Sequence, residues 1–401
     1  MSAVLADRAD KMENYDAVII GAGPAGLNAG LRLTAVGLPL SVLLIDKAVP
    51  WDRPIPCAEG VGRLGFEEAL EIDPSWIRLV ISKAKFYSPD GTCVTYTDAN
   101  KGFIIDRAKM QRDLAEKLAK RGVDIRLGVK AAAVSPANSS GTRTITLSGG
   151  GVISTRVIID ASGPASLLGR GESICWKPYD LEPAYFAVVD NVQTDDDAIH
   201  IYTGQKIAPG GYAWVFPRGG GAANIGVVVG RSRPKDANIK ELHSAFLSRH
   251  FPGASVRTYF AGSIPCGYRR GAIALPGFVK CGDAANATNP ISRAGVVEAL
   301  MSGALAGSAA FDMLSAGGAG NAKLMKKICG DYERAWFEKR GRRHLKLAKA
   351  KESLAKVPDE DYNRAAGTLV AMPPEKITMA KIFGVSLGKF PRLVWALRHL
   401  M

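Results

Sequence analysis

Residues 15–46, YDAVIIGAGPAGLNAGLRLTAVGLPLSVLLID, decide the fold that we expect for this chain. The segment opens with an apolar, β-branched run, which predicts a buried parallel strand. A GxGxxG turn and a small-residue helix follow, and a second apolar strand ends at Asp46. This order of strand, glycine turn, helix, strand and acid predicts a dinucleotide-binding βαβ unit. The motif alone leaves FAD and NAD both open.

Each position of the motif has a physical task. Gly21 permits the tight turn, Gly23 lets the backbone approach a pyrophosphate, and Gly26 lets the helix pack closely on the strand. The helix N-terminus faces the phosphates, and Asp46 accepts hydrogen bonds from a ribose. The residues expected at this part of the cofactor are Gly21, Gly23, Pro24, Ala25, Gly26, Asp46 and Lys47.

Composition limits the class of protein. The 401 residues are 47% hydrophobic with a mean hydropathy of +0.03, which is typical of a globular chain with a large core. Six cysteines are scattered without a C-x-x-C pair, so we expect no iron–sulfur, zinc or other metal site and no dithiol centre. The first residues are polar and carry no signal-peptide core, which favours a cytoplasmic protein.

The net charge of +14 is concentrated near the C-terminus. Residues 323–356 hold twelve Lys and Arg against four Asp and Glu. No nucleic-acid-binding module accompanies this charge, so we expect no nucleic-acid partner. Plain solvation and a peripheral contact with an anionic membrane both remain open. Residues 377–401 mix apolar and basic residues, which suits either a membrane-surface helix pair or a cap on the substrate cavity.

The order of predicted elements indicates an α/β (α+β) fold with three parts. Residues 14–171 and 274–320 are expected to form a discontinuous Rossmann-like domain that binds the dinucleotide. Residues 172–273, rich in short alternating strands, form an inserted antiparallel sheet that serves as a substrate domain. Residues 321–401 form a basic helical region. The helix expected over 295–314 is apolar enough to resemble a membrane span, but its acids and small residues favour burial against a sheet.

Two further segments add to the first. DASG, residues 160–163, follows another buried strand, and CGDAANATNP, residues 281–290, delivers Asp283 to where it can bind a sugar-alcohol chain. The helix that then opens can direct its N-terminal dipole at a flavin. With these three segments the chain resembles the FAD-binding proteins that include aromatic hydroxylases and geranylgeranyl reductases, from residue 15 to about 314. The resemblance implies FAD, with further contacts from Cys57, Gly60, Arg107, Asp160, Gly163, Gly282, Asp283, Pro290, Gly295 and Val296.

Three more stretches are similar to the geranylgeranyl reductase family in particular. They are PIPCAEGVG at 54–62, PGGYAWVFPRG at 209–219, and GSIP at 262–265. Membership of that family implies that reduced FAD saturates the double bonds of polyprenyl chains on lipids, chlorophylls or related isoprenoids. The chain departs from the family where glycine is usual, at Ala58, Asn286, Arg293 and Ala294, and these changes affect the flavin front.

The substrate residues are expected on a strand. Tyr212, Trp214 and Phe216 share one face by the period of two, and they suit a long apolar chain. An ordinary core face would show the same spacing, and the resemblance favours the substrate. Arg293 could stabilise a reduced flavin, bind a lipid phosphate, or form a solvent-facing ion pair. Pro217 is expected to end the strand.

The catalytic candidates lie in the loop after the second strand. The Cys57 thiol is expected beside the flavin, where it positions or protonates the substrate, and a small buried residue is the alternative. Glu59 would orient the loop or transfer protons. Arg107, at the start of a helix, would meet the FAD phosphates or form a surface ion pair.

The expected reaction is hydride transfer from the flavin to one alkene carbon, with a proton delivered to the other in a dry cavity. Because no second GxGxxG unit is present, the flavin would be reduced by transient NAD(P)H docking or by a protein donor such as ferredoxin. Two rival functions remain: a flavin monooxygenase of an aromatic substrate, and a non-enzymatic lipid-binding flavoprotein.

Overall fold

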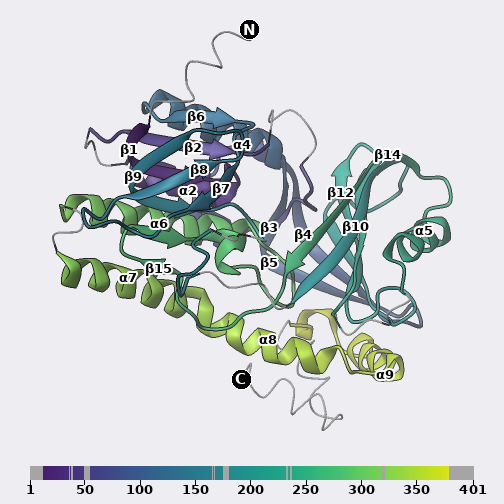
Figure 1. The fold of residues 1–401 in the computed structure, drawn as a ribbon. Helices are drawn as coiled ribbons and strands as arrows, with labels where there is room; N and C mark the ends of the chain where they lie inside the picture. The colour runs from purple at the N-terminus through teal and green to yellow at the C-terminus, as the bar shows by residue number, and fades with distance from the viewer. Residues whose placement is uncertain are drawn as a thin grey trace.

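The structure is a computed structural model, and it describes residues 12–35, 37, 39–48, 55–164, 166, 168–174, 180–231, 234, 237–317 and 321–378. Two β-sheets lie beside each other, and the C-terminal helices pass beneath both of them in the view of Figure 1. The predicted α/β class with a dinucleotide-type sheet is confirmed.

Five parallel strands form the centre of the first sheet, whose order is β15-β16-β9-β1-β2-β6. The apolar runs of β1, β2, β9 and β16 are buried on both faces, which is typical of parallel strands covered on both sides, whereas β6 at the edge is only partly buried. Two antiparallel strands, β8 and β7, continue the sheet from the first half of β9. The strands are β1 (Glu13–Ile20), β2 (Val42–Asp46), β6 (Asp124–Leu127), β7 (Ala131–Val134), β8 (Arg143–Leu147), β9 (Val152–Asp160), β15 (Ala274–Leu275) and β16 (Phe278–Lys280).

Alternate residues of β1 enter two different cores. Ala17 and Ile19 pack against the helices, whereas Val18 and Ile20 face the side covered by β7 and β8. The helical layer contains α2 (Pro24–Leu33), α4 (Arg107–Lys120), α6 (Val296–Ser315) and α7 (Ala322–Trp336). All five parallel strands therefore end at one edge, where ligands bind in open α/β sheets.

Helices α2 and α6 approach each other at backbone distance. A Cβ on Gly303 would lie 2.2 Å from the carbonyl oxygen of Ala25, and one on Gly307 would lie 2.3 Å from that of Ala29. The two pairs advance together along both helices, so α2 and α6 run parallel and their N-termini point the same way. Asn28 fixes the contact because its side chain donates to the carbonyl of Leu300 at 2.8 Å.

The second sheet has the order β14-β10-β13-β12-β11-β4-β5-β3. One face packs on α5 (Ile239–His250), and the other carries a cluster of aromatic and aliphatic side chains. Its pairs are antiparallel except for β11 with β4. The strands are β3 (Gly60–Gly62), β4 (Ile77–Tyr87), β5 (Cys93–Ile105), β10 (Leu181–Asp190), β11 (Ala198–Tyr202), β12 (Tyr212–Gly219), β13 (Ala222–Val228) and β14 (Ser255–Pro265).

The second sheet is larger than the sequence predicts. Strands β3, β4 and β5 come from residues 60–105, which the predicted boundaries give to the FAD-binding domain. They join the second sheet because β4 pairs with β11, more than 100 residues later. The predicted range 172–273 therefore lacks three strands of the sheet, and the division into three domains stays a prediction. Strand β12 also runs through Pro217 to Gly219, so the expected end at Pro217 is wrong.

The C-terminal region is helical as far as it is described. Helix α7 continues through a π-helical turn, Phe337–Gly341, into α8 (Arg342–Leu354), and α9 (Asp359–Val370) follows. The remaining short elements are α3 (Arg63–Ala69) and 3₁₀ turns at Pro74–Trp76, Gly282–Ala285 and Pro374–Lys376. The predicted helix pair over 377–401 lies almost entirely outside the described residues.

Helix α6 is the one element among the described residues that is long and apolar enough to cross a membrane. Most of its apolar stretch is buried within the protein, against α2 and β9. The expected burial of this helix against the sheet is confirmed.

The α2–α6 contact yields a test of the fold. Gly303→Ala should lower the free energy of unfolding by about 1–3 kcal/mol, because its methyl group must displace the Ala25 carbonyl. Thermal and denaturant unfolding of the purified variant would measure the change.

Gly330→Ala is the matched control. Gly330 lies inside α7, and a Cβ there would meet no atom within 4 Å. Alanine should stabilise this helix by about 0.5–1 kcal/mol. Equal effects of the two substitutions would contradict the close packing of α2 on α6.

Candidate active site

One continuous cavity of about 1050 Å³ lies between the two sheets. It begins at the strand ends of the first sheet, passes the loop around Cys57, and follows the apolar face of the second sheet. Helix α9 lines its far end through Ala365 and Leu369. The cavity therefore joins a polar, dinucleotide-type end to an apolar end.

The first helix opens directly into the cavity. Gly21 has a φ of 111°, and a Cβ there would lie 2.2 Å from the carbonyl oxygen of Ala161, so the turn requires glycine. Gly23 and Pro24 line the cavity, and a Cβ on Gly23 would meet no atom within 4 Å. Within the described residues no side chain caps α2, so its first N–H groups face this space. Asp46 supports the turn by accepting from the amide of Ala22 at 2.7 Å.

A second uncapped helix N-terminus meets the same space. Gly295 and Val296, at the start of α6, line the cavity, and no described side chain caps that helix either. Asp283 lies beside it and accepts a hydrogen bond from the Thr288 hydroxyl at 2.7 Å. Burial raises the pKa of the Asp283 carboxyl, against the opposing effects of Thr288 and Arg107. An anionic carboxylate here therefore calls for further hydrogen-bond donors.

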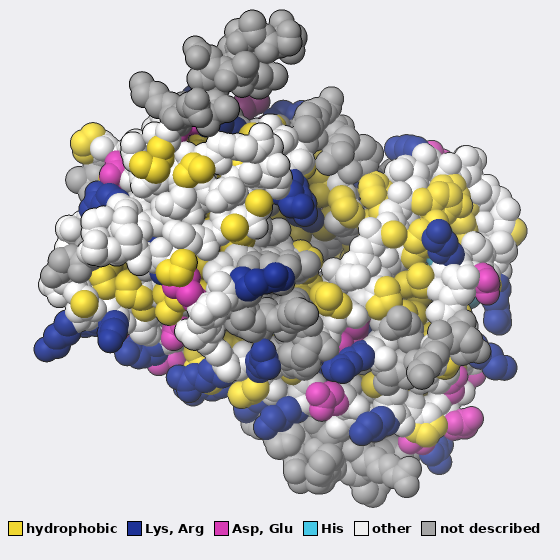
Figure 2. All heavy atoms as spheres, in the orientation of Figure 1, with side chains coloured by type: hydrophobic (Ala, Val, Ile, Leu, Met, Phe, Trp, Pro, Cys, Tyr) yellow, Lys and Arg dark blue, Asp and Glu magenta, His cyan; other side chains and the backbone are white. Residues whose placement is uncertain are grey.

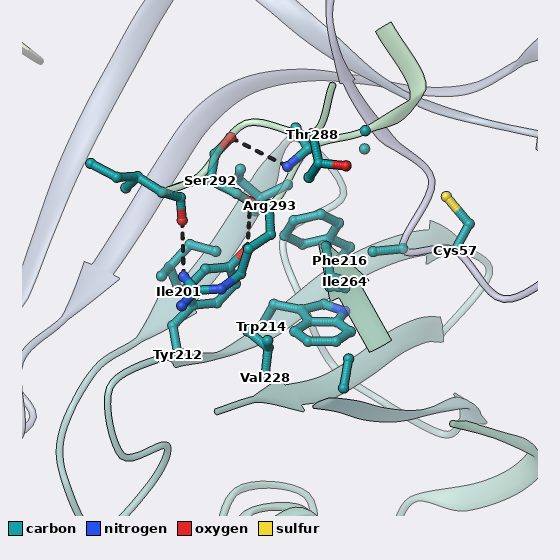
Figure 3. A pocket seen from close by; sticks show the side chains of 18 of the residues that line it. Cys57, Ile201, Tyr212, Trp214, Phe216, Val228, Ile264, Thr288, Ser292 and Arg293 are labelled. Atoms are coloured by element: carbon teal, nitrogen blue, oxygen red, sulfur yellow. Dashed lines mark hydrogen bonds between the residues drawn. The ribbon is translucent and has the colours of Figure 1, made fainter. Parts of the chain in front are cut away.

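Three aromatic side chains project from β12 into the cavity (Figure 3). Tyr212, Trp214 and Phe216 lie on one face, as the spacing predicts. The Tyr212 hydroxyl donates to the carbonyl of Ser292 at 2.6 Å. Together with Phe186 these rings form an apolar wall.

A buried amide ties this wall to the Cys57 loop. The Trp214 indole donates to Asn224 at 2.9 Å, and the Asn224 amide donates to the carbonyl of Cys57 at 2.9 Å. Asn224 is fully buried on β13. Because both of its partners are polar groups at the cavity wall, Asn224 fixes the loop relative to the aromatic strand.

Glu59 is buried in the wall of the cavity, where it holds the loop. Its carboxylate forms an ion pair with Arg218 and accepts from the backbone amide of Arg107 at 3.2 Å. Its amide donates to the Cys57 sulfur at 3.2 Å, and its φ is 66°. A left-handed non-glycine residue of this kind costs about 1–3 kcal/mol and persists only where its surroundings enforce it. These contacts hold the loop in place, and the catalytic role expected of Glu59 stays a prediction.

The Arg293 side chain is also buried, which rules out the alternative of a solvent-facing ion pair. Its guanidinium donates to Glu182 at 2.6 Å and to the carbonyls of Ile291 and Gly210, and it lies 4.9 Å from the centroid of the Tyr212 ring. Lys351 of α8 completes the network through Glu182 at 3.0 Å and Asp180. The network positions Tyr212, and a contact of Arg293 with substrate stays a prediction.

Two of the departures from glycine keep a glycine-like backbone. Asn286 and Arg293 have φ values of 51° and 58°, in the left-handed region. Both residues therefore adopt a backbone conformation that glycine usually occupies.

The structure brings most predicted site residues to this cavity. Those that line it are Gly23, Pro24, Ala25, Asp46, Cys57, Glu59, Gly60, Arg107, Gly163, Tyr212, Trp214, Phe216, Gly282, Asp283, Arg293, Gly295 and Val296. Those that do not line it are Gly21, Gly26, Lys47, Asp160 and Pro290.

Asp160, expected to contact the cofactor, does not line the cavity. Its carboxylate is fully buried, pairs with Lys280 at 3.0 Å, and accepts from the hydroxyls of Ser162 and Ser166. Asp160 and Lys280 are direct partners in the β9–β16 ladder, which brings the two charges together. Asp160 therefore orders the turn from behind, and the residues after it, such as Gly163, face the cavity.

Sequence reasoning missed Asn224, Thr288, Glu182 and Lys351. Asn224 could have been found, because a single amide inside the apolar run AANIGVVV must have a buried partner. Thr288 lies within a segment that was already singled out. The sequence does not distinguish Lys351 from the many other basic residues of its helix.

Comparison with known proteins agrees with this geometry. Residues 180–262 match the family model of the geranylgeranyl reductase catalytic domain, and residues 16–179 match that of lycopene cyclase protein. Digeranylgeranylglycerophospholipid reductases of Methanosarcina acetivorans and Methanocella arvoryzae are each 31% identical, over 96% and 95% of this chain and 96% and 97% of theirs. A crystal structure of a geranylgeranyl bacteriochlorophyll reductase-like protein from Thermoplasma acidophilum superposes with a TM-score of 0.87 and 26% identity, covering 98% of this chain and 100% of that one.

The fold and the cavity define a protein of the dinucleotide-binding flavoprotein type. Within that class, the chain belongs to the geranylgeranyl reductase family.

The Asn224 link can be tested directly. Asn224→Ala should leave the Trp214 indole and the Cys57 carbonyl unpaired, at a cost of about 1–3 kcal/mol for each group. We expect a lower denaturation midpoint and faster alkylation of Cys57, followed by peptide mass spectrometry.

Asn363→Ala serves as the control, because Asn363 makes an exposed hydrogen bond to the amide of Asp90. This variant should change the free energy of unfolding by less than about 0.5 kcal/mol. Unchanged stability and Cys57 reactivity in Asn224→Ala would show that the link does not hold the loop.

Proposed function

We propose that this protein is an FAD-dependent reductase that saturates carbon–carbon double bonds of geranylgeranyl or related polyprenyl chains. The observation that carries the proposal is the continuous cavity, which joins two uncapped helix N-termini to an aromatic wall. The family relatives support it, since two of them are named for the reduction of a digeranylgeranyl glycerophospholipid.

The polar end of the cavity fits FAD. The free amides at the start of α2 suit a pyrophosphate, with space above Gly23 for close approach. Asp283 is a buried acceptor with room for a sugar hydroxyl, and Arg107 supplies positive charge nearby. The N-terminus of α6 suits the edge of a flavin where negative charge develops. Bound FAD would supply the hydride when reduced.

The apolar end fits a polyprenyl chain. Tyr212, Trp214 and Phe216 offer a wall without free polar groups, because the Tyr212 hydroxyl and the Trp214 indole already have partners. The wall and α9 exclude water from the alkene, which otherwise is a poor hydride acceptor. Arg293, held by Glu182, keeps Tyr212 in place.

The reaction adds one hydride and one proton across the double bond. Cys57 lines the cavity, and we assign it the positioning or protonation of the alkene. Glu59 orients the loop through Arg218 and the Arg107 amide, so its role is indirect. Bound FAD would receive its electrons from docked NAD(P)H or from a protein donor such as ferredoxin.

The protein would act in the cytoplasm at the surface of a membrane that holds its lipid substrate. Figure 2 shows Lys and Arg side chains along the lower edge of the visible face, over α7 and α8. Exposed basic residues there include Lys326, Arg342, Arg343, Lys346 and Lys349. A row of this kind suits anionic lipid.

An anaerobic assay tests the function. The purified protein should carry FAD, and after reduction by dithionite it should be reoxidised by geranylgeranyl lipids that gain two hydrogens for each bond. Flavin absorbance and product mass would be followed together. Reduced flavin that persists with every polyprenyl substrate, or oxygen-dependent hydroxylation of an aromatic compound, would refute the proposal.

Cys57→Ala should retain FAD and lose turnover by about 10²–10⁴-fold if the thiol delivers the proton. Cys93→Ala is the control, since Cys93 is the other partly exposed cysteine among the described residues and does not line the cavity. Equal turnover in the two variants would show that the Cys57 thiol takes no part in the reaction.

Asp283→Asn separates stability from cofactor binding. Because burial raises the pKa of Asp283, the apoprotein should lose stability as the pH rises through that raised pKa. The variant should therefore unfold at a higher temperature than wild type at pH 7–8, with the difference vanishing below about pH 4. Its FAD affinity should fall about tenfold.

Asp312→Asn, which changes an exposed carboxylate near the end of α6, should alter neither the unfolding temperature nor FAD affinity. If the unfolding temperatures of Asp283→Asn and wild type differed by the same amount at every pH, the buried Asp283 carboxylate would not be the cause of the difference.

A further inference from the structure

A second cavity, of about 400 Å³, lies against the outer side of the Cys57 loop. Its walls come from the start of β4, the first two turns of α4, and strands β10, β12 and β14. Its volume is within the range of small-molecule sites, about 300–1,000 Å³. Neither the cofactor nor the polyprenyl chain of the proposed function needs this space.

The charged side chains of the wall carry one positive charge in excess, four cations against three carboxylates. The cations are Arg78, Lys109, Arg112 and Arg218, against the carboxylates of Glu59, Asp106 and Asp113. Each carboxylate already has a cation: Arg78 pairs with Asp106, Lys109 with Asp113 at 2.7 Å, and Arg218 with Glu59.

Arg112 is the cation in excess. It is exposed and lines the cavity, and within the described part of the chain no carboxylate pairs with it. Arg218, deeper in the wall, has its pKa lowered by burial and, to a smaller extent, by the charge of Arg257. Both arginines therefore favour an added negative charge.

The outer cavity adjoins the active site. Cys57 and Glu59 line both cavities, so the loop forms the shared wall. Beside it, Phe260 of the outer cavity stacks on Phe186 of the inner one, with ring centroids 4.8 Å apart. An anion beside Arg218 competes with Glu59 for the guanidinium and so reaches the loop that carries Cys57.

We propose that the outer cavity binds a phosphate or diphosphate group, with Arg112 and Arg78 as its principal contacts and Arg218 at its base. Guanidinium groups are the side chains best suited to bind phosphate oxygens in pairs. Two sources carry this chemistry: a nicotinamide dinucleotide that reduces FAD, or the headgroup of a phospholipid substrate. The choice of source rests on the proposed function, whereas the anion site itself does not.

Titration of the FAD-bound protein with inorganic pyrophosphate tests the site. Isothermal calorimetry at low ionic strength should show saturable binding that weakens by about tenfold or more in Arg112→Glu. Arg112→Lys should recover part of the affinity, because the charge remains and the paired geometry is lost. Lys120→Ala, an exposed cation at the end of the same helix, should bind as wild type does.

Turnover then separates the two sources. If the nicotinamide dinucleotide docks here, Arg112→Glu should lose NADPH-driven flavin reduction while dithionite-driven reduction of geranylgeraniol is unchanged. If the headgroup docks here, the variant should lose activity on a phospholipid substrate and keep activity on geranylgeraniol, with dithionite as reductant throughout.

Absent pyrophosphate binding, or equal affinities of wild type, Arg112→Glu and Lys120→Ala, would overturn the proposal. Pyrophosphate binding that depends on Arg112, in a protein that reduces no polyprenyl compound with dithionite, would support the anion site and refute the reductase function instead.

Discussion

The close, parallel approach of α2 and α6 is the constraint on which the site depends. Gly303 and Gly307 lie against the carbonyls of Ala25 and Ala29, where no side chain fits between the helices. Because the helices run parallel, both N-termini meet the same end of the cavity, although they are more than 270 residues apart in sequence. The unpaired backbone amides at the start of both helices therefore face one cavity. This arrangement suits a cofactor that carries a pyrophosphate at one end and a reducible ring at the other.

The second sheet supplies the apolar wall of the same cavity. Its inner face is apolar and aromatic, and the polar atoms it contains already have partners in Asn224 and the carbonyl of Ser292. Below it, Arg293, Glu182 and Lys351 form a buried ion network between the sheet, the turn before α6, and α8. Buried charges of this kind are costly unless all are paired, so the network favours one fixed arrangement of these three elements. The site is thus rigid where it borders the substrate, and the C-terminal helices are part of it.

Much of this could be predicted from local patterns. The glycine turn, the strand ending at Asp46, the segment around Asp283 and the alternation of Tyr212, Trp214 and Phe216 each carry their meaning within a few residues. The failures involve partners far apart in sequence. The alternation of residue types along the chain identifies β4 as a strand, but it cannot show that β4 pairs with β11. Asp160 has the spacing of a cofactor ligand, but its carboxylate is committed to Lys280, which the β9–β16 register places beside it. Arg293 likewise meets Glu182 of β10 only in the folded chain.

The central claim is that one cavity holds FAD and a polyprenyl chain end to end, with the Cys57 loop between the two sheets. A crystal structure of the FAD-bound protein with a saturated geranylgeranyl lipid analogue tests it most directly. The account predicts the pyrophosphate at the N-terminus of α2, the flavin ring between the N-terminus of α6 and Cys57, and the chain along Tyr212, Trp214 and Phe216 toward α9. Lipid density outside this cavity, or a flavin ring turned away from the aromatic wall, would contradict it.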